Sequence, residues 1–258
     1  MVNNRPSKAL LCTGVLVYLF LYVPLIVVVV FSFNDSKLNA EWVGFTWKWY
    51  EKLIHNEDIL RAAGNSLIIA IVSAAMATVL GTLAGLAMYR GRQKWLPALV
   101  LGPIAMPDIL IGVSLLLMFI LLNISLGSVS IILAHVSFCI GFVALAVQSR
   151  LAGMDHSLIE AARDLGASPW QSFRLISLPL LMPGIIAGGL MAFTLSIDDF
   201  VITFFTAGVG SSTLPLEIYS MVKIAVTPEV NAVSTLLMLV TLTLITLLSK
   251  ISPAVLRQ

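Results

Sequence analysis

Charged residues are scarce in this sequence, and the pattern that binds nucleotide phosphates is missing. Only 11% of the 258 residues are charged, whereas about 25% is typical of a soluble domain, which excludes an ordinary soluble globular protein. No Gly-x4-Gly-Lys-Ser/Thr motif occurs, and no glycine is followed by lysine. The chain therefore has no phosphate-cradling loop of its own, and any energy from nucleotide hydrolysis has to come from a partner.

Cysteine and histidine are also rare, which removes the usual redox and metal frameworks. Cys12 and Cys139 lie inside apolar stretches and are expected to be small hydrophobic residues without a disulfide. His55, His135 and His156 do not have metal-ligand spacing, and we interpret His135 as a hydrogen-bonded packing residue. We expect no metal, no cofactor and no enzymatic activity in this chain. The formal net charge of +2 gives no reason to expect nucleic acid as a partner.

Long apolar stretches dominate what is present. Hydrophobic residues make up 59% of the sequence, and the mean hydropathy is +1.01, which indicates a multi-pass membrane protein. Six stretches are long enough to cross a hydrocarbon core about 30 Å thick; they cover residues 9–33, 66–89, 96–123, 128–149, 183–206 and 231–248. The third contains Pro97, Pro103 and Pro107, which predict a broken helix. The predicted fold class is an all-α membrane protein, a single domain over residues 1–258 with six transmembrane helices.

The distribution of lysine and arginine predicts the orientation in the membrane. With a cytoplasmic N-terminus, ten of the fifteen basic residues lie on the cytoplasmic side: Arg5, Lys8, Arg90, Arg92, Lys94, Arg150, Arg163, Arg174, Lys250 and Arg257. Both termini, and the connection between the fourth and fifth spans, are then cytoplasmic. The first stretch is too long for a signal peptide, and its exit at residues 31–35 lacks a small-x-small cleavage site. We expect it to remain as an uncleaved span.

A charged, helix-like stretch interrupts the apolar sequence at residues 150–180. Ser157 and Glu160 have the spacing of a capping box at a helix start, and His156 lies at the entry. Apolar residues follow at helical spacing on one stripe: Leu158, Ile159, Ala162 and Leu165. Gly166 comes next, and glycine tolerates the left-handed conformation that ends a helix.

A second helix start follows this glycine directly. Ser168 is placed to cap it, and Pro169 to occupy its first position, where no N–H is missed. Pro179 and Pro183 are expected to end it. The whole is an amphipathic helix-turn-helix, which would either dock a cytoplasmic partner or lie on the membrane surface.

Three aspartates fall at membrane depth. Asp108 lies about twelve residues into the third span, and Asp198 and Asp199 lie about fifteen residues into the fifth. Each costs roughly 2.5–3.5 kcal/mol on insertion scales, and no lysine or arginine lies inside a predicted span to neutralise them. The compensating charge is expected from a cationic substrate, a partner chain or a proton.

Polar residues of the fifth span extend this site. On a continuous helix, four of them share one face that would line a cavity: Ser196, Asp199, Thr203 and Thr206. Asp198 would then lie about 100° away around the helix. One aspartate would line the substrate path, and the other would hold the structure of that path. The alternative is that these polar groups serve helix packing.

Two sets of motifs resemble known transport proteins. The pattern Glu160-Ala161-Ala162-x3-Gly166-x9-Ile176-x-Leu178-Pro179 resembles the coupling loop of the membrane subunits of bacterial ATP-driven (ABC) importers. Between Ser32 and Ala232, further segments resemble the second permease subunit of the spermidine/putrescine importers: Ser32-Phe33-Asn34, Trp49-Tyr50, Pro107-Asp108-Ile109, Phe193-Thr194-Leu195-Ser196-Ile197-Asp198-Asp199, Leu214-Pro215-Leu216-Glu217-Ile218-Tyr219-Ser220 and Pro228-Glu229-Val230-Asn231-Ala232. Asp35 departs from the small polar residue expected there.

The resemblance implies a set of partners and residue roles. This chain would pair with a second permease subunit in the bacterial inner membrane, two copies of an ATPase holding ATP and Mg would dock on the coupling loops, and an extracytoplasmic binding protein would deliver spermidine or putrescine. Substrate-path residues would be Asp108, Ser196, Asp198 and Asp199. Residues of ATPase coupling would be Glu160, Ala161, Ala162, Gly166, Ile176, Leu178 and Pro179.

Two connections on the outer side have open interpretations. The aromatic segment 34–65 would receive the binding protein or form an interfacial aromatic belt. The connection 207–230 would be a second docking site or a partial re-entrant gate.

Three other functions share part of this pattern. A permease for another small solute shares every feature except the aspartates. A proton- or sodium-coupled secondary transporter would use the aspartates as ion carriers and would not need the Glu160 loop. An intramembrane aspartyl protease also needs two aspartates, but no Gly-x-Gly-Asp context occurs.

Overall fold

Helices make up almost all of the described chain. The computed structural model describes residues 8–37, 41–91, 93–155 and 157–251. The predictions that involve Arg5, Arg92, His156 and Arg257, or the side chains of Lys8 and Lys250, fall outside what it describes. Within the described residues the strand-like pairing is a single bridge between Asn34 and Phe45. Two compact units are formed, one by residues up to Leu60 together with Ile218–Val240 and the other by Arg61–Glu217 with the end of the chain.

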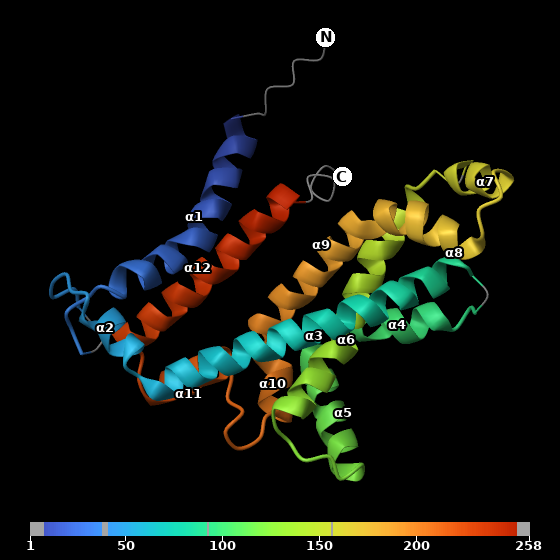
Figure 1. Cartoon of the computed structure of the whole chain (residues 1–258). Coiled ribbons are helices and arrows are strands. Elements are labelled where there is room, and N and C mark those ends of the chain that lie inside the picture. Colours follow the sequence, from blue (N-terminus) through green and yellow to red (C-terminus); the bar gives the residue numbers. More distant parts are fainter. Residues whose placement is uncertain (1–7, 38–40, 92, 156, 252–258) are drawn as a thin grey trace. The chain divides into compact units, whose positions relative to one another are not determined.

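The first unit contains α1 (Lys8–Phe31), α2 (Lys48–Ile54) and the first part of α12 (Pro228–Ile251) (Figure 1). The loop after α1 folds around the fully buried side chain of Asn34, whose Nδ2 donates to the carbonyl of Glu41 and whose Oδ1 accepts from the N–H of Val43. Lys52 of α2 forms an ion pair with Glu229 of α12. Asp35, which departs from the family pattern, pairs with Lys48.

The aromatic residues of this loop have two different fates. Phe33 stacks on Phe45, with 5.3 Å between ring centroids, and the hydroxyl of Tyr50 hydrogen-bonds Ser32 at 2.7 Å. Trp49 donates to the carbonyl of Asn34. Three residues of the segment, Phe45 among them, keep about half or more of their surface exposed: Trp42, Phe45 and Trp47. The segment is therefore an internally bonded scaffold that presents part of its aromatic surface.

The second unit contains the remaining helices (Figure 1). They are α3 (Glu57–Tyr89, from Arg61 on), α4 (Leu96–Ala105), α5 (Asp108–Leu121), α6 (Ser128–Ala152), α7 (Ser157–Asp164), α8 (Pro169–Ser172), α9 (Leu178–Ile197), α10 (Val201–Thr206) and the start of α11 (Leu214–Ile224). A π turn at Phe173–Ser177 joins α8 to α9.

Five described helices are long and apolar enough to cross a membrane, and α4 with α5 forms a sixth candidate that is bent by 114°. This agrees with the six predicted spans and with the predicted break in the third. The break falls at Met106 and Pro107, where a residue before proline is pushed into extended backbone. Asp108 therefore begins a helix instead of lying in the middle of one.

The fifth span differs from the prediction at both ends. It begins at Pro169 and runs through the π turn to Ile197, so Pro179 and Pro183 do not end the helix. In the π turn the N–H of Leu178 donates to the carbonyl of Phe173, five residues earlier, and Pro179 sits in the first turn of α9, where a missing N–H costs little. At the other end, α9 stops at Ile197 and α10 starts at Val201. The predicted continuous polar stripe is thus interrupted.

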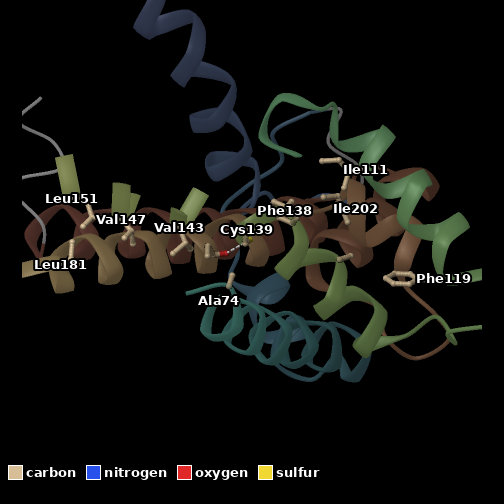
Figure 2. Close-up of a cluster of buried hydrophobic side chains, with 13 residues drawn as sticks. Ala74, Ile111, Phe119, Phe138, Cys139, Val143, Val147, Leu151, Leu181 and Ile202 are labelled. Atoms are coloured by element: carbon tan, nitrogen blue, oxygen red, sulfur yellow. Dashed lines mark hydrogen bonds between the residues drawn. The ribbon is translucent and has the colours of Figure 1, made fainter. Parts of the chain in front are cut away.

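Close helix packing builds the core of the second unit. Figure 2 shows the cluster in which Val143, Val147 and Leu151 of α6 lie with Leu181 of α9, all of them buried. Glycine permits the approach, since a Cβ at Gly81 of α3 would come within 2.6 Å of the Cβ of Val143.

Candidate functional site

The stretch 150–180, which the sequence predicts to be a coupling loop and which is called the coupling segment below, folds as two short helices around Gly166. This glycine has φ +89°, the left-handed region that only glycine adopts without strain. Its N–H donates to the carbonyl of Arg163 at 2.9 Å, and the N–H of Ala167 donates to that of Ala162 at 3.0 Å. These two bonds form a Schellman ending of α7, as the sequence predicted.

The two helix starts behave differently. Ser168 caps α8 as predicted, because its Oγ accepts from the N–H of Gln171 while the Gln171 side chain accepts from the N–H of Ser168 at 2.8 Å. At α7 the predicted capping residue, Ser157, already lies inside the helix, and its N–H donates to the carboxylate of Asp155 at 2.9 Å. The Ser157–Glu160 capping box is therefore wrong: Asp155 takes the acceptor role.

The coupling segment leaves apolar side chains uncovered. Leu165 is 90% exposed and Trp170 is 66% exposed. Glu160 and Ala161 are exposed on α7 and Ala162 is half-buried. Of the other predicted coupling residues, Ile176 lies in the π turn, and Leu178 and Pro179 begin α9. An exposed apolar surface next to charged groups is typical of a docking surface.

A cleft of about 380 Å³ opens behind this surface. It lies between the ends of α3 and α6 and the coupling segment, and its charged lining residues are Arg90, Glu160 and Arg163. Ser172, whose side chain is buried and without a hydrogen-bond partner, contributes to its wall. The coupling helices are therefore not packed flush against the membrane helices.

Asp199 holds the start of α10. Its Oδ2 accepts from the N–H of Thr203 at 2.8 Å and from the Thr203 hydroxyl at 2.8 Å, and its Oδ1 lies 3.4 Å from the N–H of Ile202. The same Oδ2 lies 3.2 Å from Nε2 of His135 in α6. The prediction that this carboxylate is uncompensated is wrong, because helix N–H groups, a hydroxyl and an imidazole surround it.

Ser196 belongs to the same cluster. Its hydroxyl lies 2.7 Å from Nδ1 of His135, and Nε2 of His135 lies 3.0 Å from the Thr203 hydroxyl. Ser196, His135 and Thr203 are all buried. The structure thus brings Ser196 and Asp199 together through a histidine, and the polar stripe expected on one continuous helix is a cluster around a break.

Asp198 and Asp108 differ from Asp199 in being exposed. Asp198 follows the last residue of α9, at the break. Asp108 is the first residue of α5, where the helix dipole stabilises a carboxylate. One turn further, Gly112 of α5 packs so closely on α10 that a Cβ there would lie 2.6 Å from the Phe205 ring. Both exposed aspartates therefore stand at helix ends next to a break.

His135 is the member of the cluster that the sequence did not single out as a site residue, whereas Thr203 was expected on the polar face of the fifth span. The expectation that His135 is hydrogen-bonded is confirmed. Its neighbours, Ser196 and Thr203, are 61 and 68 residues away, so no local spacing in the sequence could reveal them.

Comparison with known proteins places these features in a family. Residues 77–258 match the model of the family described as "Binding-protein-dependent transport system inner membrane component". The chain is 45% identical over 232 residues to the spermidine/putrescine transport system permease protein PotC of Escherichia coli K12, covering 89% of this chain and 88% of that protein. It is 43% identical over 250 residues to the putrescine transport system permease protein PotI of the same organism, covering 92% and 89%.

Two solved structures share the fold. A bacterial ABC transporter involved in import of the acidic polysaccharide alginate has a chain that superposes with a TM-score of 0.70 at 13% identity, covering 96% of this chain and 99% of that one. The MetNI methionine ABC transporter gives a TM-score of 0.65 at 23% identity, covering 77% and 96%.

Proposed function

This chain belongs to the family of inner membrane components of binding-protein-dependent transport systems, and on that premise we propose that it is a permease subunit of an ATP-driven importer of polyamines. As a family member it is a multi-pass protein of the bacterial inner membrane and not an enzyme. The proposal of a polyamine substrate rests on the 45% identity to a spermidine/putrescine permease over 89% of this chain.

The exposed aspartates suit such a substrate. A polyamine is a flexible chain of ammonium groups separated by methylenes, so it needs carboxylates that are separate from one another and free to meet a cation. Asp198 and Asp108 meet this requirement, because both are exposed and each stands at a helix end. We assign them to the substrate path, together with the supporting Ser196 and Asp199.

The proposed complex has three kinds of partner. A second permease subunit completes the path, two ATPase copies holding ATP and Mg dock on the coupling loops, and a binding protein delivers the polyamine from outside. Support for the ATPase contact comes from the exposed apolar side chains of the coupling segment, Leu165 and Trp170. The distribution of lysine and arginine supports a cytoplasmic side for both chain termini and for this loop.

Copurification of the complex tests this function. We expect this chain to purify with a second permease and an ATPase, and polyamine-loaded binding protein to stimulate ATP hydrolysis by the complex in proteoliposomes. The isolated chain should neither bind nor hydrolyse ATP, since it lacks a phosphate loop. ATP turnover by the purified chain alone would contradict the proposal.

The two main alternatives give other results in the same preparation. Uptake that survives ATP depletion and follows a proton or sodium gradient would indicate a secondary transporter. Stimulation by a different solute, with none from spermidine or putrescine, would indicate an ABC permease for another substrate.

A charge reversal on α7 tests the coupling role. Glu160 is exposed on the coupling helix, so Glu160→Lys changes a contact charge without removing a buried group. We expect the variant to insert normally and to copurify poorly with the ATPase. Normal ATPase binding together with normal polyamine uptake would show that Glu160 is not part of the docking surface.

A further inference from the structure

His135 joins the two sides of the break in the fifth span. Its Nδ1 contacts the Ser196 hydroxyl at 2.7 Å, at the end of α9, and its Nε2 contacts the Thr203 hydroxyl at 3.0 Å, in α10. The residues between α9 and α10, 198–200, are not helical. One imidazole, held by α6, thus bonds to both sides of the break.

This bridge fits a broken helix better than a continuous one. In a continuous α-helix the side chains of Ser196 and Thr203, seven residues apart, would be separated by about 10.5 Å along the axis. One imidazole ring with hydrogen bonds of 2.7 and 3.0 Å is too short to cover that separation. The contacts of His135 therefore favour the break over a straight helix.

The hydrogen-bond roles within the cluster are fixed by counting donors. The Thr203 hydroxyl gives its one hydrogen to Oδ2 of Asp199, so it can only accept from the imidazole. Oδ2 of Asp199 is an acceptor as well. Nε2 of His135 therefore carries a hydrogen, which points toward both oxygens at 3.0 and 3.2 Å. Ser196, whose hydroxyl can donate or accept, satisfies Nδ1.

The cluster gives the two neighbouring aspartates different surroundings. Oδ2 of Asp199 accepts from the N–H and hydroxyl of Thr203 and lies beside His135, and its side chain is only 9% exposed. Such a carboxylate has little surface left for an ammonium group. Asp198, one residue earlier, is exposed. The break turns one carboxylate inward and leaves the other outward.

We propose that His135 is a positioning residue of the substrate path: by bridging Ser196 and Thr203 and donating to Asp199, it holds the break that presents Asp198 to the substrate. The inference rests on the proposed function for the substrate and deepens it, because it gives the two aspartates different roles. His135 itself does not touch the polyamine.

Three substitutions at this position separate positioning from packing. His135→Gln keeps a donor for Asp199 and Thr203, His135→Asn reaches only toward Ser196, and His135→Leu fills the space without any hydrogen bond. We expect polyamine uptake by the assembled complex to fall in the order Gln, Asn, Leu, with Leu at least about tenfold below wild type, the size that follows from losing a buried hydrogen bond to a charged group. A packing role predicts instead that Leu, an apolar residue of similar size, is tolerated better than the smaller and polar Asn.

Ser137→Asn is the matched control, since Ser137 is exposed on the same helix. It should leave uptake unchanged. In an Asp198→Asn background, His135→Asn should add little further loss, because its effect acts through Asp198. Independent, multiplicative losses in the double variant would overturn the proposal.

Thiol labelling tests the position of residue 198 without transport. In the assembled complex, with Cys12 replaced by serine and the buried Cys139 kept, an Asp198→Cys side chain should react rapidly with a cationic thiosulfonate reagent. His135→Leu should slow this reaction about tenfold or more, and His135→Gln should slow it less. Equal labelling in all variants would overturn the proposal. If the wild-type complex proves not to carry polyamines while the labelling order holds, the proposed function fails and the positioning role stands.

Discussion

The backbone N–H of Thr203 lies 2.8 Å from Oδ2 of Asp199, so a side chain at the break in the fifth span caps the helix that follows it. Asp198, the preceding residue, is exposed and takes no part in this cap. The two neighbouring carboxylates therefore have separate physical roles, and substitutions at them should have separable effects.

Removing Asp199 should affect stability first. Asp199→Ala leaves N–H groups of α10 and the buried Thr203 hydroxyl without their acceptor, which we expect to lower the free energy of unfolding by about 1–3 kcal/mol. The thermal midpoint of the purified complex measures this. Asp198→Ala is the control and should shift the midpoint little. Equal midpoints for both variants would contradict the capping role.

Neutralising Asp198 should affect transport instead. Asp198→Asn keeps the size of the side chain and removes the charge, so polyamine uptake should fall strongly while assembly and the thermal midpoint stay at wild-type values. Uptake measured over a range of substrate concentrations, together with substrate retention by the binding protein, checks this. Wild-type uptake in this variant would make the residue irrelevant to the path.

Asp108→Asn should behave like Asp198→Asn. Asp108 is exposed in the first turn of α5, where its charge contributes about 0.3–1 kcal/mol at most through the helix dipole. We expect assembly close to wild type and reduced polyamine uptake. If uptake is unchanged and only stability falls, Asp108 serves the helix start and not the cation path.

The turn of the coupling segment depends on one glycine. Gly166→Val forces a β-branched residue to φ +89°, which costs about 1–2 kcal/mol and displaces α8 from α7. The variant should insert normally and lose copurification with the ATPase, while the binding protein still holds substrate. Gly153→Ala, at the end of α6 with φ −92° and no atom nearer than 3.9 Å, is the matched control.

Two glycines of α3 should respond oppositely to the same substitution. A Cβ at Gly81 would meet Val143 at 2.6 Å, whereas no atom lies within 4 Å of a Cβ at Gly64. We expect Gly81→Ala to destabilise the complex by about 1–3 kcal/mol through overpacking. Gly64→Ala should stabilise it by about 0.5–1 kcal/mol through helix propensity. Comparison of thermal midpoints decides this, and equal shifts would show that the α3–α6 contact is loose.

Local chemistry in the sequence was sufficient for part of this structure. Pro107 predicts the break in the third span because proline restricts the residue before it. Gly166 and Ser168 predict the turn between the coupling helices because left-handed backbone and cap acceptors are properties of single residues.

Tertiary contacts decided the rest. No proline or glycine marks the break at residues 198–200; it depends on Asp199 and on His135, a residue more than sixty positions away. For the same reason a continuous polar stripe was predicted where a cluster exists. The π turn that carries the helix past Pro179 depends on hydrogen bonds five residues apart, which apolar periodicity does not reveal.

The π turn at Phe173–Ser177 also sets the direction in which the side chains of α8 face relative to those of α9. A π turn contains one residue more than the α-helical register needs, so the surface of α8 and the end of α9 are offset by about 100° relative to an uninterrupted α-helix. Leu175 is 71% exposed, and deleting it would remove the extra residue without opening a core. The 28 residues left between Pro169 and Ile197 would then present Trp170 in a direction turned by about 100° relative to α9. The extra residue of the π turn therefore sets how the exposed surface of α8 is rotated about the helix axis relative to the break at Asp198, about 43 Å further along the helix.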